Sequence, residues 1–164
     1  MSGPEAADGE NLYQVVFDLP DDIAAWAPGG SERLWVAKTP VQLEVEVRNT
    51  PFYFKGVSYL DRVRVRIDHE RRELVYDEFV AESGHSTVRI VLMDPHVGAD
   101  VRELLDRFGC TWEIEAGERL WAIDVPPSVG YEALLADLDK LLEAGKIEIQ
   151  EAALSRAHGG PLAG

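Results

Sequence analysis

The chain has 164 residues, of which 46% are hydrophobic, and its formal net charge is −14 at neutral pH. This length is enough to bury a core, either as one domain or as two small ones. The acidic charge opposes binding to nucleic acid, and the single cysteine, Cys110, excludes an internal disulfide and a zinc site made of several thiolates. Residues 1–10 do not resemble a signal peptide and no later run is apolar enough to span a membrane, so we expect a cytoplasmic protein with no membrane partner.

The first half of the chain is predicted to be a small antiparallel sheet or barrel. Residues 1–10 are expected to be a disordered tail, and an antiparallel β subdomain follows over residues 11–84. Apolar and polar residues alternate in Val41–Val47, which is the period of a half-buried strand, and Arg62–Ile67 repeats the alternation. In chain order, strands are expected at residues 12–17, 33–37, 41–47, 62–67 and 73–80, with a loop-like stretch over residues 23–32.

Three closely spaced arginines, Arg62, Arg64 and Arg66, lie on one face of a predicted strand. Such spacing is compatible with nucleic-acid binding. However, acidic residues on the neighbouring predicted strands offer cross-strand partners of the right sign, so we favour pairing within the sheet. The expected acidic partners are Glu44, Glu46, Glu73 and Asp77.

After Gly84 the sequence changes to a succession of strands and helices. A buried strand over Ser86–Met93 is followed by a helix with apolar residues at i, i+3, i+4 and i+7, which we expect to end at Gly109. A hairpin, a second helix and a last strand complete the β-α-β-β-α-β order of a ferredoxin-like fold. We therefore predict an α+β protein with a ferredoxin-like subdomain at residues 85–154 and a flexible tail at residues 155–164.

The ferredoxin-like topology serves many functions and does not select one of them. A metal carrier with this topology needs paired thiolates after the first strand, and the loop Met93–Gly98 has none. An RNA-binding version needs stacking aromatic residues on a basic sheet. The first strand of this half has no aromatic residue and the chain is acidic, so both subtypes are excluded.

The sequence shows no convincing catalytic constellation. His85 lies in Ser83–Thr87, where a glycine permits a tight hydrogen-bonded bend, and we favour a structural role for it over one as general base. His96 lies beside Asp94 in a short loop, which is more typical of solvated turn residues. The sequence has neither a Gly-x-Ser-x-Gly elbow nor a glycine-rich phosphate loop. We predict no catalytic residue, no metal site and no cofactor.

The most specific segment of the chain is residues 48–61, which contains four aromatic residues, a proline and a glycine between two predicted strands. This composition requires one defined backbone path. Together with Ser83–Thr87 it marks the junction of the two halves, and we expect any small-molecule site to lie there. The candidate binding residues are Trp35, Asn49, Phe52, Tyr53, Phe54, Tyr59, Ser83 and His85.

Two segments, Asn49–Asp61 and Glu82–Arg89, resemble the hallmark sequences of a bacterial family of unknown function, domain of unknown function 4265. The resemblance extends over roughly Leu12–Leu154. It supplies no reaction, cofactor or catalytic residue.

Two functional classes remain. In the first, the protein is a non-catalytic acidic binding protein, such as an immunity or antitoxin-like inhibitor that covers a basic effector protein, because acidic inhibitors associate rapidly with basic partners. In the second, it is a sensor-like protein that binds a small molecule at the junction of its halves. An enzyme is the least supported class, and the sequence does not indicate an oligomeric state.

Overall fold

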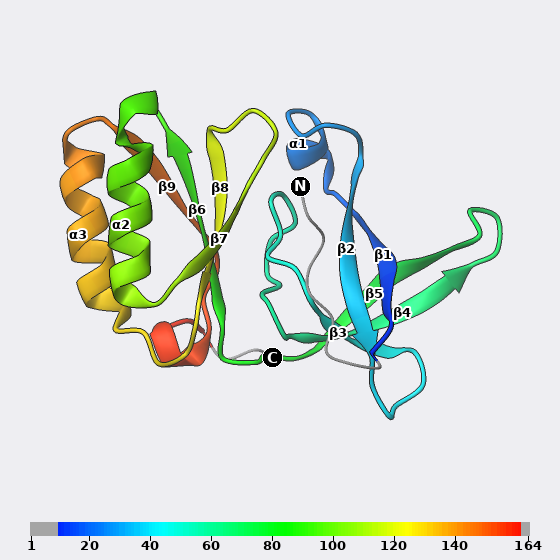
Figure 1. Ribbon diagram of the computed structural model, residues 1–164. Coiled ribbons are helices and arrows are strands. Elements are labelled where there is room, and N and C mark those ends of the chain that lie inside the picture. The colour runs from blue at the N-terminus through cyan, green and yellow to red at the C-terminus, as the bar shows by residue number, and fades with distance from the viewer. Residues whose placement is uncertain (1–9, 162–164) are drawn as a thin grey trace.

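The computed structural model describes residues 10–161, which form two halves lying side by side (Figure 1). Within these residues, five strands of the first half close into a barrel in the order β1-β2-β3-β4-β5. Neighbouring strands are antiparallel, and the ring closes where Val16 of β1 pairs in parallel with Val75 of β5. The strands are β1 Leu12–Asp18, β2 Ser31–Lys38, β3 Glu44–Val47, β4 Arg62–Asp68 and β5 Glu73–Ala81. Of the tail predicted at residues 1–10, residues 1–9 lie outside the described part.

Side chains along each strand point alternately inward and outward, and the inward-facing ones fill the barrel interior. An aromatic group closes one side of this interior, where the rings of Phe17, Phe54 and Tyr76 have centroids 5.0 Å apart. The buried residues of the interior are Val15, Phe17, Leu34, Val36, Val45, Val47, Val57, Val63 and Val65.

The outward arginines of β4 pair with acidic side chains of the barrel. Arg62 lies 3.8 Å from Glu44 on β3, which is one of the predicted partners, and Arg64 pairs with Glu78 on β5. Arg66 lies 3.7 Å from Asp68 on its own strand. Pairing within the sheet is therefore confirmed, although only one of these arginines uses a predicted partner. Each such exposed pair contributes at most about 1 kcal/mol.

Two stretches of the first half differ from the sequence prediction. The strand predicted at Val41–Val47 begins only at Glu44, because Leu43 has a positive φ of 60° and the backbone turns at that point. The stretch predicted to be loop-like, residues 23–32, overlaps a one-turn helix, α1, at Asp21–Ala24 and the first two residues of β2. A turn this short has too few positions to show a helical period, so the sequence pattern could not indicate it.

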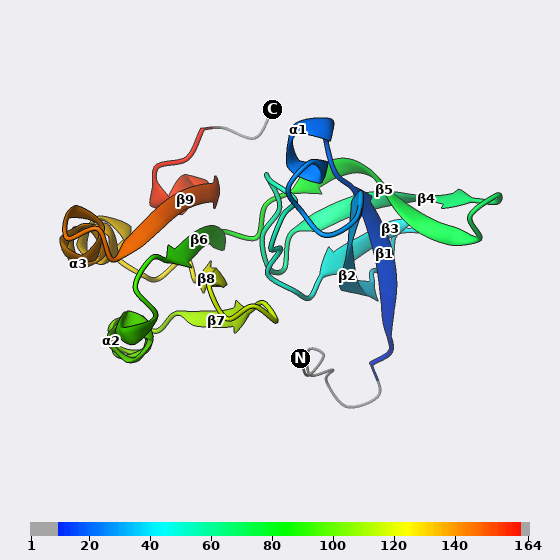
Figure 2. The ribbon, with the colours of Figure 1, turned by 90° about the horizontal axis from the view of Figure 1, so that it is seen from above.

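The second half is a four-stranded antiparallel sheet with two helices packed on one face (Figure 2). The strand order is β7-β8-β6-β9, and the predicted β-α-β-β-α-β order of elements is present. The first helix ends as expected at Gly109, which has a left-handed φ of 79°. The elements are β6 Ser86–Leu92, α2 Gly98–Phe108, β7 Thr111–Ile114, β8 Leu120–Val125, α3 Tyr131–Glu143 and β9 Ile147–Ala153, with a 3-10 turn at Pro95–Val97.

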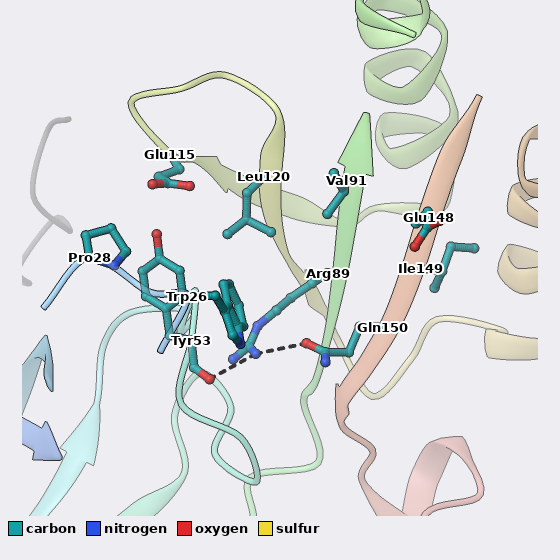
Figure 3. A pocket seen from close by; sticks show the side chains of 10 residues that line it. All are labelled: Trp26, Pro28, Tyr53, Arg89, Val91, Glu115, Leu120, Glu148, Ile149 and Gln150. Carbon is teal, nitrogen blue, oxygen red and sulfur yellow. Dashed lines mark hydrogen bonds between the residues drawn. The ribbon is translucent and has the colours of Figure 1, made fainter. Parts of the chain in front are cut away.

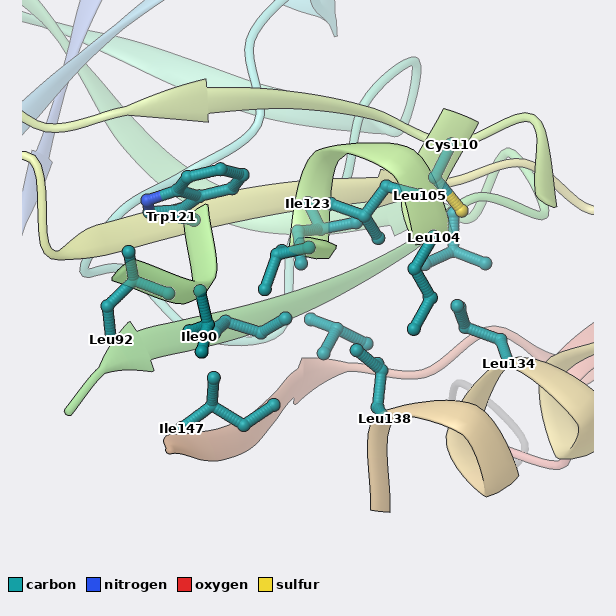
Figure 4. Close-up of a cluster of buried hydrophobic side chains, with 14 of the residues drawn as sticks. Ile90, Leu92, Leu104, Leu105, Cys110, Trp121, Ile123, Leu134, Leu138 and Ile147 are labelled. Carbon is teal, nitrogen blue, oxygen red and sulfur yellow. The ribbon is translucent and has the colours of Figure 1, made fainter. Parts of the chain in front are cut away.

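A continuous apolar core lies between this sheet and its helices (Figure 4). Trp121 and Ile123 of β8 and Leu134 and Leu138 of α3 are among its fully buried members. Burying one such aliphatic side chain contributes about 1.5–3 kcal/mol. Cys110 also belongs to this core, and burial raises the pKa of its thiol to about 12, so the thiol remains protonated at neutral pH.

The residues that follow β9 pack against the second half. Arg156–His158 form a 3-10 turn, and the buried His158 ring lies with Nδ1 2.6 Å from Ser86 Oγ and with its centroid 5.4 Å from the ring of Tyr131. The expectation of a flexible tail is therefore wrong for residues 155–160, because this imidazole provides both an apolar face and a hydrogen-bonding edge. Residues 162–164 lie outside the described part.

Candidate functional site

The segment that the sequence marks as most specific joins the two halves through its main chain. Residues 50–56, which we name the junction loop, lie between the barrel and the sheet. From the barrel side, Glu32 of β2 is buried, and its carboxylate accepts hydrogen bonds from three consecutive backbone N–H groups at 2.7–3.1 Å. The donors are Phe52, Tyr53 and Phe54. A carboxylate that accepts several N–H groups is held firmly in place.

Arg89 of β6 holds the same loop from the sheet side. Its guanidinium is only 2% exposed and donates to the carbonyl oxygens of Pro51, Tyr53 and Phe54. It also donates to the side-chain oxygen of Gln150 on β9 at 3.1 Å. Burial lowers the pKa of Arg89 to about 10, partly offset by the charge of Glu32, so the guanidinium remains charged at neutral pH. The carboxylate of Glu32 thus accepts from the backbone N–H groups of the junction loop, and the guanidinium of Arg89 donates to its carbonyl oxygens.

The sheet face that α2 and α3 leave uncovered, which we name the open face, carries its side chains in rows across the strands. Strand pairing and the alternation of side chains define three rows. The first row is Thr111, Asp124 and Thr87; the second is Glu113, Ala122, Arg89 and Gln150; the third is Glu115, Leu120, Val91 and Glu148.

The barrel half covers the first two rows. In the first row, Thr87 Oγ1 lies 2.9 Å from Ser58 Oγ. In the second, Glu113 accepts hydrogen bonds from the Asn49 side chain at 3.1 Å and from the Thr50 backbone N–H at 3.2 Å. Burial raises the pKa of Glu113, while these two hydrogen bonds act in the opposite direction. These rows therefore serve the contact between the halves.

The third row is only partly covered, since Leu120 packs against an apolar cluster that includes Phe52 and Tyr53, and the row forms the floor of a groove of about 390 Å³ (Figure 3). One wall comes from the first half, where Trp26 is 56% exposed and its ring lies 5.4 Å from that of Tyr53. The hydroxyl of Tyr53 faces the carboxylate of Glu115 (Figure 3), and burial together with this carboxylate raises the pKa of Tyr53. The complete lining is Trp26, Pro28, Tyr53, Arg89, Val91, Glu115, Leu120, Glu148, Ile149 and Gln150.

His85 occupies a separate position at the base of the junction. Its Nδ1 lies 2.8 Å from Asp124 on β8, and its ring packs edge-on against Tyr59 with centroids 5.4 Å apart. Its backbone N–H donates to Ser83 Oγ, whose hydroxyl donates to the Tyr59 carbonyl at 2.7 Å. Burial raises the pKa of Asp124, and the neighbouring His85 lowers it. These contacts fix the position of the His85 ring between Asp124 and Tyr59.

Asp61 lies near His85 at the same end of the junction and makes further hydrogen bonds there. It is 3% exposed, and its two carboxylate oxygens accept the backbone N–H groups of Ser58 and Ser83, each at 2.8 Å. Burial raises the pKa of Asp61 to about 6, although these hydrogen bonds act against the shift. A carboxyl that is costly to ionise therefore holds together the two chain segments on which the halves meet.

The predicted binding residues do not converge on one cavity. Tyr59, Ser83 and His85 meet at the base, and only Tyr53 lines the groove of the third row. Phe52 is buried and Phe54 packs into the barrel, while Asn49 links the Trp35 backbone N–H, at 2.7 Å, to Glu113. Sequence reasoning did not identify the roles of Glu32, Trp26, Arg89, Glu113, Glu115 or Glu148. The one available signal was Arg89, the single charged residue of the buried strand β6.

With this geometry established, comparison with known proteins assigns the family. The sequence profile described as Domain of unknown function (DUF4265) matches residues 32–149. The chain belongs to the DUF4265 family. The matched region of this DUF4265 protein contains both Glu32 and Arg89 and is narrower than the Leu12–Leu154 span of the resemblance noted in the sequence. No curated protein matches the chain.

A solved structure resembles most of the DUF4265 chain in fold. It is described as a novel crystal structure of a hypothetical protein from Neisseria gonorrhoeae. The two chains are 17% identical, and the match has a TM-score of 0.69 and covers 87% of this chain and 94% of the other. At this identity the likeness concerns the fold alone.

The described part of this DUF4265 protein offers no cluster of three or more histidine, cysteine or acidic side chains arranged to hold a metal ion. In residues 10–161 no helix has both the length and the apolar character needed to cross a membrane.

Proposed function

We propose that this protein is a non-catalytic acidic binding protein whose partner is a protein with a basic surface. The observation that carries the proposal is the partly covered third row, where an exposed tryptophan and two carboxylates border a groove at the junction. The net charge of −14 gives the whole molecule a field that attracts such a partner. An immunity or antitoxin-like inhibitor of a basic effector, acting in the cytoplasm, is the form of this function that we favour.

The use of charge at the junction supports binding over catalysis. Glu32, Arg89 and Glu113 are bonded to the junction loop or to Asn49, and Asp124 is bonded to His85. The contacts of Glu32, Arg89 and Glu113 hold the halves together and commit these charges to the structure rather than to a substrate. We also infer that the second half is ferredoxin-like, since its strand order and paired helices have that arrangement. This fold serves many functions and does not by itself select one of them.

The capture of a basic protein tests the proposal. The immobilised protein is incubated with lysate of its own source cells and with the purified products of neighbouring genes. We expect it to retain a basic protein that is released as salt is raised, because salt screens exposed charges over about 10 Å at 0.1 M and about 3 Å at 1 M. Absence of any specific partner, or a partner whose retention is unaffected by salt, would contradict the proposal.

A small-molecule function at the junction is the second candidate. The groove volume of about 390 Å³ supports it, since ligand pockets usually measure about 300–1,000 Å³. A thermal-shift screen of metabolites distinguishes it from the first candidate. A ligand that raises the melting temperature of wild-type protein but not of Tyr53→Ala would favour this second function.

A further inference from the structure

We propose that the third row of the open face binds an extended segment of the partner with basic residues at positions i and i+4 and an apolar residue at i+2. This inference rests on the proposed function and specifies the chemistry of the site. The row runs across the sheet in the order Glu115, Leu120, Val91, Glu148, so that two apolar side chains lie between two carboxylates (Figure 3).

The spacing of the carboxylates selects the spacing in the ligand. Glu115 follows β7 and Glu148 lies on β9, at the two edges of the four-stranded sheet. Three strand intervals of about 4.8 Å place their backbones about 14 Å apart. An extended peptide rises about 3.3 Å per residue, so side chains at i and i+4 are separated by about 13 Å and lie on the same face as the side chain at i+2.

The carboxylates are available to a ligand in different ways. Glu115 borders the groove beside the Tyr53 hydroxyl (Figure 3), and its carboxylate has acceptor positions that a ligand can use. Glu148 is exposed and makes no hydrogen bond or ion pair with the residues that the structure describes. Among the described residues that line the groove, the one positively charged residue is Arg89 of the second row, which is buried and directs its guanidinium to the carbonyl oxygens of the junction loop. The two carboxylates therefore set the charge that a ligand meets.

Trp26 and the centre of the row explain why an apolar residue belongs between the two charges. Leu120 and Val91 are partly buried and present aliphatic surface at the middle of the floor. Trp26 leaves more than half of its surface exposed at the wall of the groove. An indole face attracts a guanidinium by cation–π interaction and stacking. Arginine is therefore favoured over lysine at the basic position of the ligand that lies nearer to Trp26.

Blocked pentapeptides provide a direct test. Isothermal titration compares Arg-Gly-Leu-Gly-Arg with Gly-Arg-Leu-Arg-Gly, which has the same composition but a shorter spacing, and with Glu-Gly-Leu-Gly-Glu. We expect the first peptide to bind most tightly and the acidic peptide not to bind. The double variant Glu115→Gln/Glu148→Gln should weaken binding about tenfold, since each exposed pair contributes up to about 1 kcal/mol. Glu132→Gln/Glu143→Gln, on α3, removes the same charge from the other side of the sheet and should leave binding unchanged.

Two results would overturn this inference. One is equal weakening by the two double variants, which would mean that net charge alone matters. The other is equal binding, or no binding, of the two arginine peptides. The proposed function is judged separately by capture of the cellular partner. If both double variants retain a basic partner equally well, that function stands and the assignment of the third row fails. If the first peptide binds the groove but no basic partner is captured, the proposed function fails and the groove chemistry stands.

Discussion

The covered rows and the partly covered third row of the open face carry charged residues of the same kinds and use them differently. In the covered rows, Arg89 and Glu113 are buried or half-buried and bonded to the junction loop and to Asn49. In the third row, Glu115 borders a groove and Glu148 is exposed. The comparison separates charges that hold the molecule together from charges that can meet a partner. Substitutions in the first two rows should therefore lower mainly the free energy of unfolding, and substitutions in the third row should weaken mainly binding.

The largest effect on stability is expected for Arg89→Met. The substitution leaves Glu32 as a buried charge without its positive neighbour and leaves three loop carbonyls without their donor. Loss of one partner from a buried charged arrangement costs about 3–5 kcal/mol. Chemical denaturation measures this loss, with Arg107→Met on the exposed face of α2 as the control. A loss below about 1 kcal/mol would show that the covered rows are not essential to the junction.

Asp61 should give the junction a pH-dependent stability. Its pKa of about 6 in the folded protein lies above the ordinary value of 3.8, so the folded state binds this proton more tightly than the unfolded state. Stability from this group is therefore greatest below pH 4 and falls as the pH rises through 6. At about 1.4 kcal/mol per unit of pKa, the change is about 3 kcal/mol.

Comparison with Asp61→Asn isolates this contribution from those of other carboxyl groups. The difference in free energy of unfolding between wild type and variant, measured by denaturation from pH 4 to pH 7, should move in favour of the variant as the pH rises. A difference that stays constant over this range would rule out an elevated pKa for Asp61.

Asn49→Ala should have an intermediate effect. The change removes an acceptor for the Trp35 backbone N–H and a donor to Glu113, and each of these hydrogen bonds is partly buried. We expect a loss of about 1–3 kcal/mol in the free energy of unfolding. Asn11→Ala, at an exposed position before β1, is the matched control and should change stability little. Equal losses in the two variants would indicate that Asn49 does not link the halves.

The smallest effect on stability is expected for Glu148→Gln in the third row. Because the side chain is exposed and unpaired among the described residues, the free energy of unfolding should change by less than about 0.5 kcal/mol. Binding of the Arg-Gly-Leu-Gly-Arg peptide should nevertheless weaken severalfold. A clear loss of stability without loss of binding would reverse the distinction between the two regions.

Much of the fold follows from local pattern, whereas the site depends on register. The alternation in Arg62–Ile67 and the glycine at Gly109 identify a strand and a helix end without any knowledge of distant residues. The rows of the open face appear only when β7, β8, β6 and β9 are aligned, and a shift of one residue would move every side chain to the other face.

The contacts of Glu32 and Arg89 with the junction loop could not be predicted from the sequence for a related reason. Glu32 and Arg89 bind backbone atoms located twenty or more positions away, and backbone atoms leave no mark in a sequence. The position of Trp26 at the groove was also hidden, because Trp26 follows a one-turn helix that is too short to predict. His158 follows a strand and precedes two glycines, a composition typical of a chain end that does not pack.

Because Glu32 and Arg89 bind the main chain of the junction loop, these hydrogen bonds do not depend on the identity of the loop side chains, although Phe52 and Phe54 are also held by packing. An exchange at Tyr53 would keep the N–H that Glu32 accepts and the carbonyl that Arg89 binds. The wall of the groove can therefore diversify during evolution while the architecture beneath it is retained. A scaffold of this kind can acquire new binding preferences through single substitutions without first acquiring compensating ones.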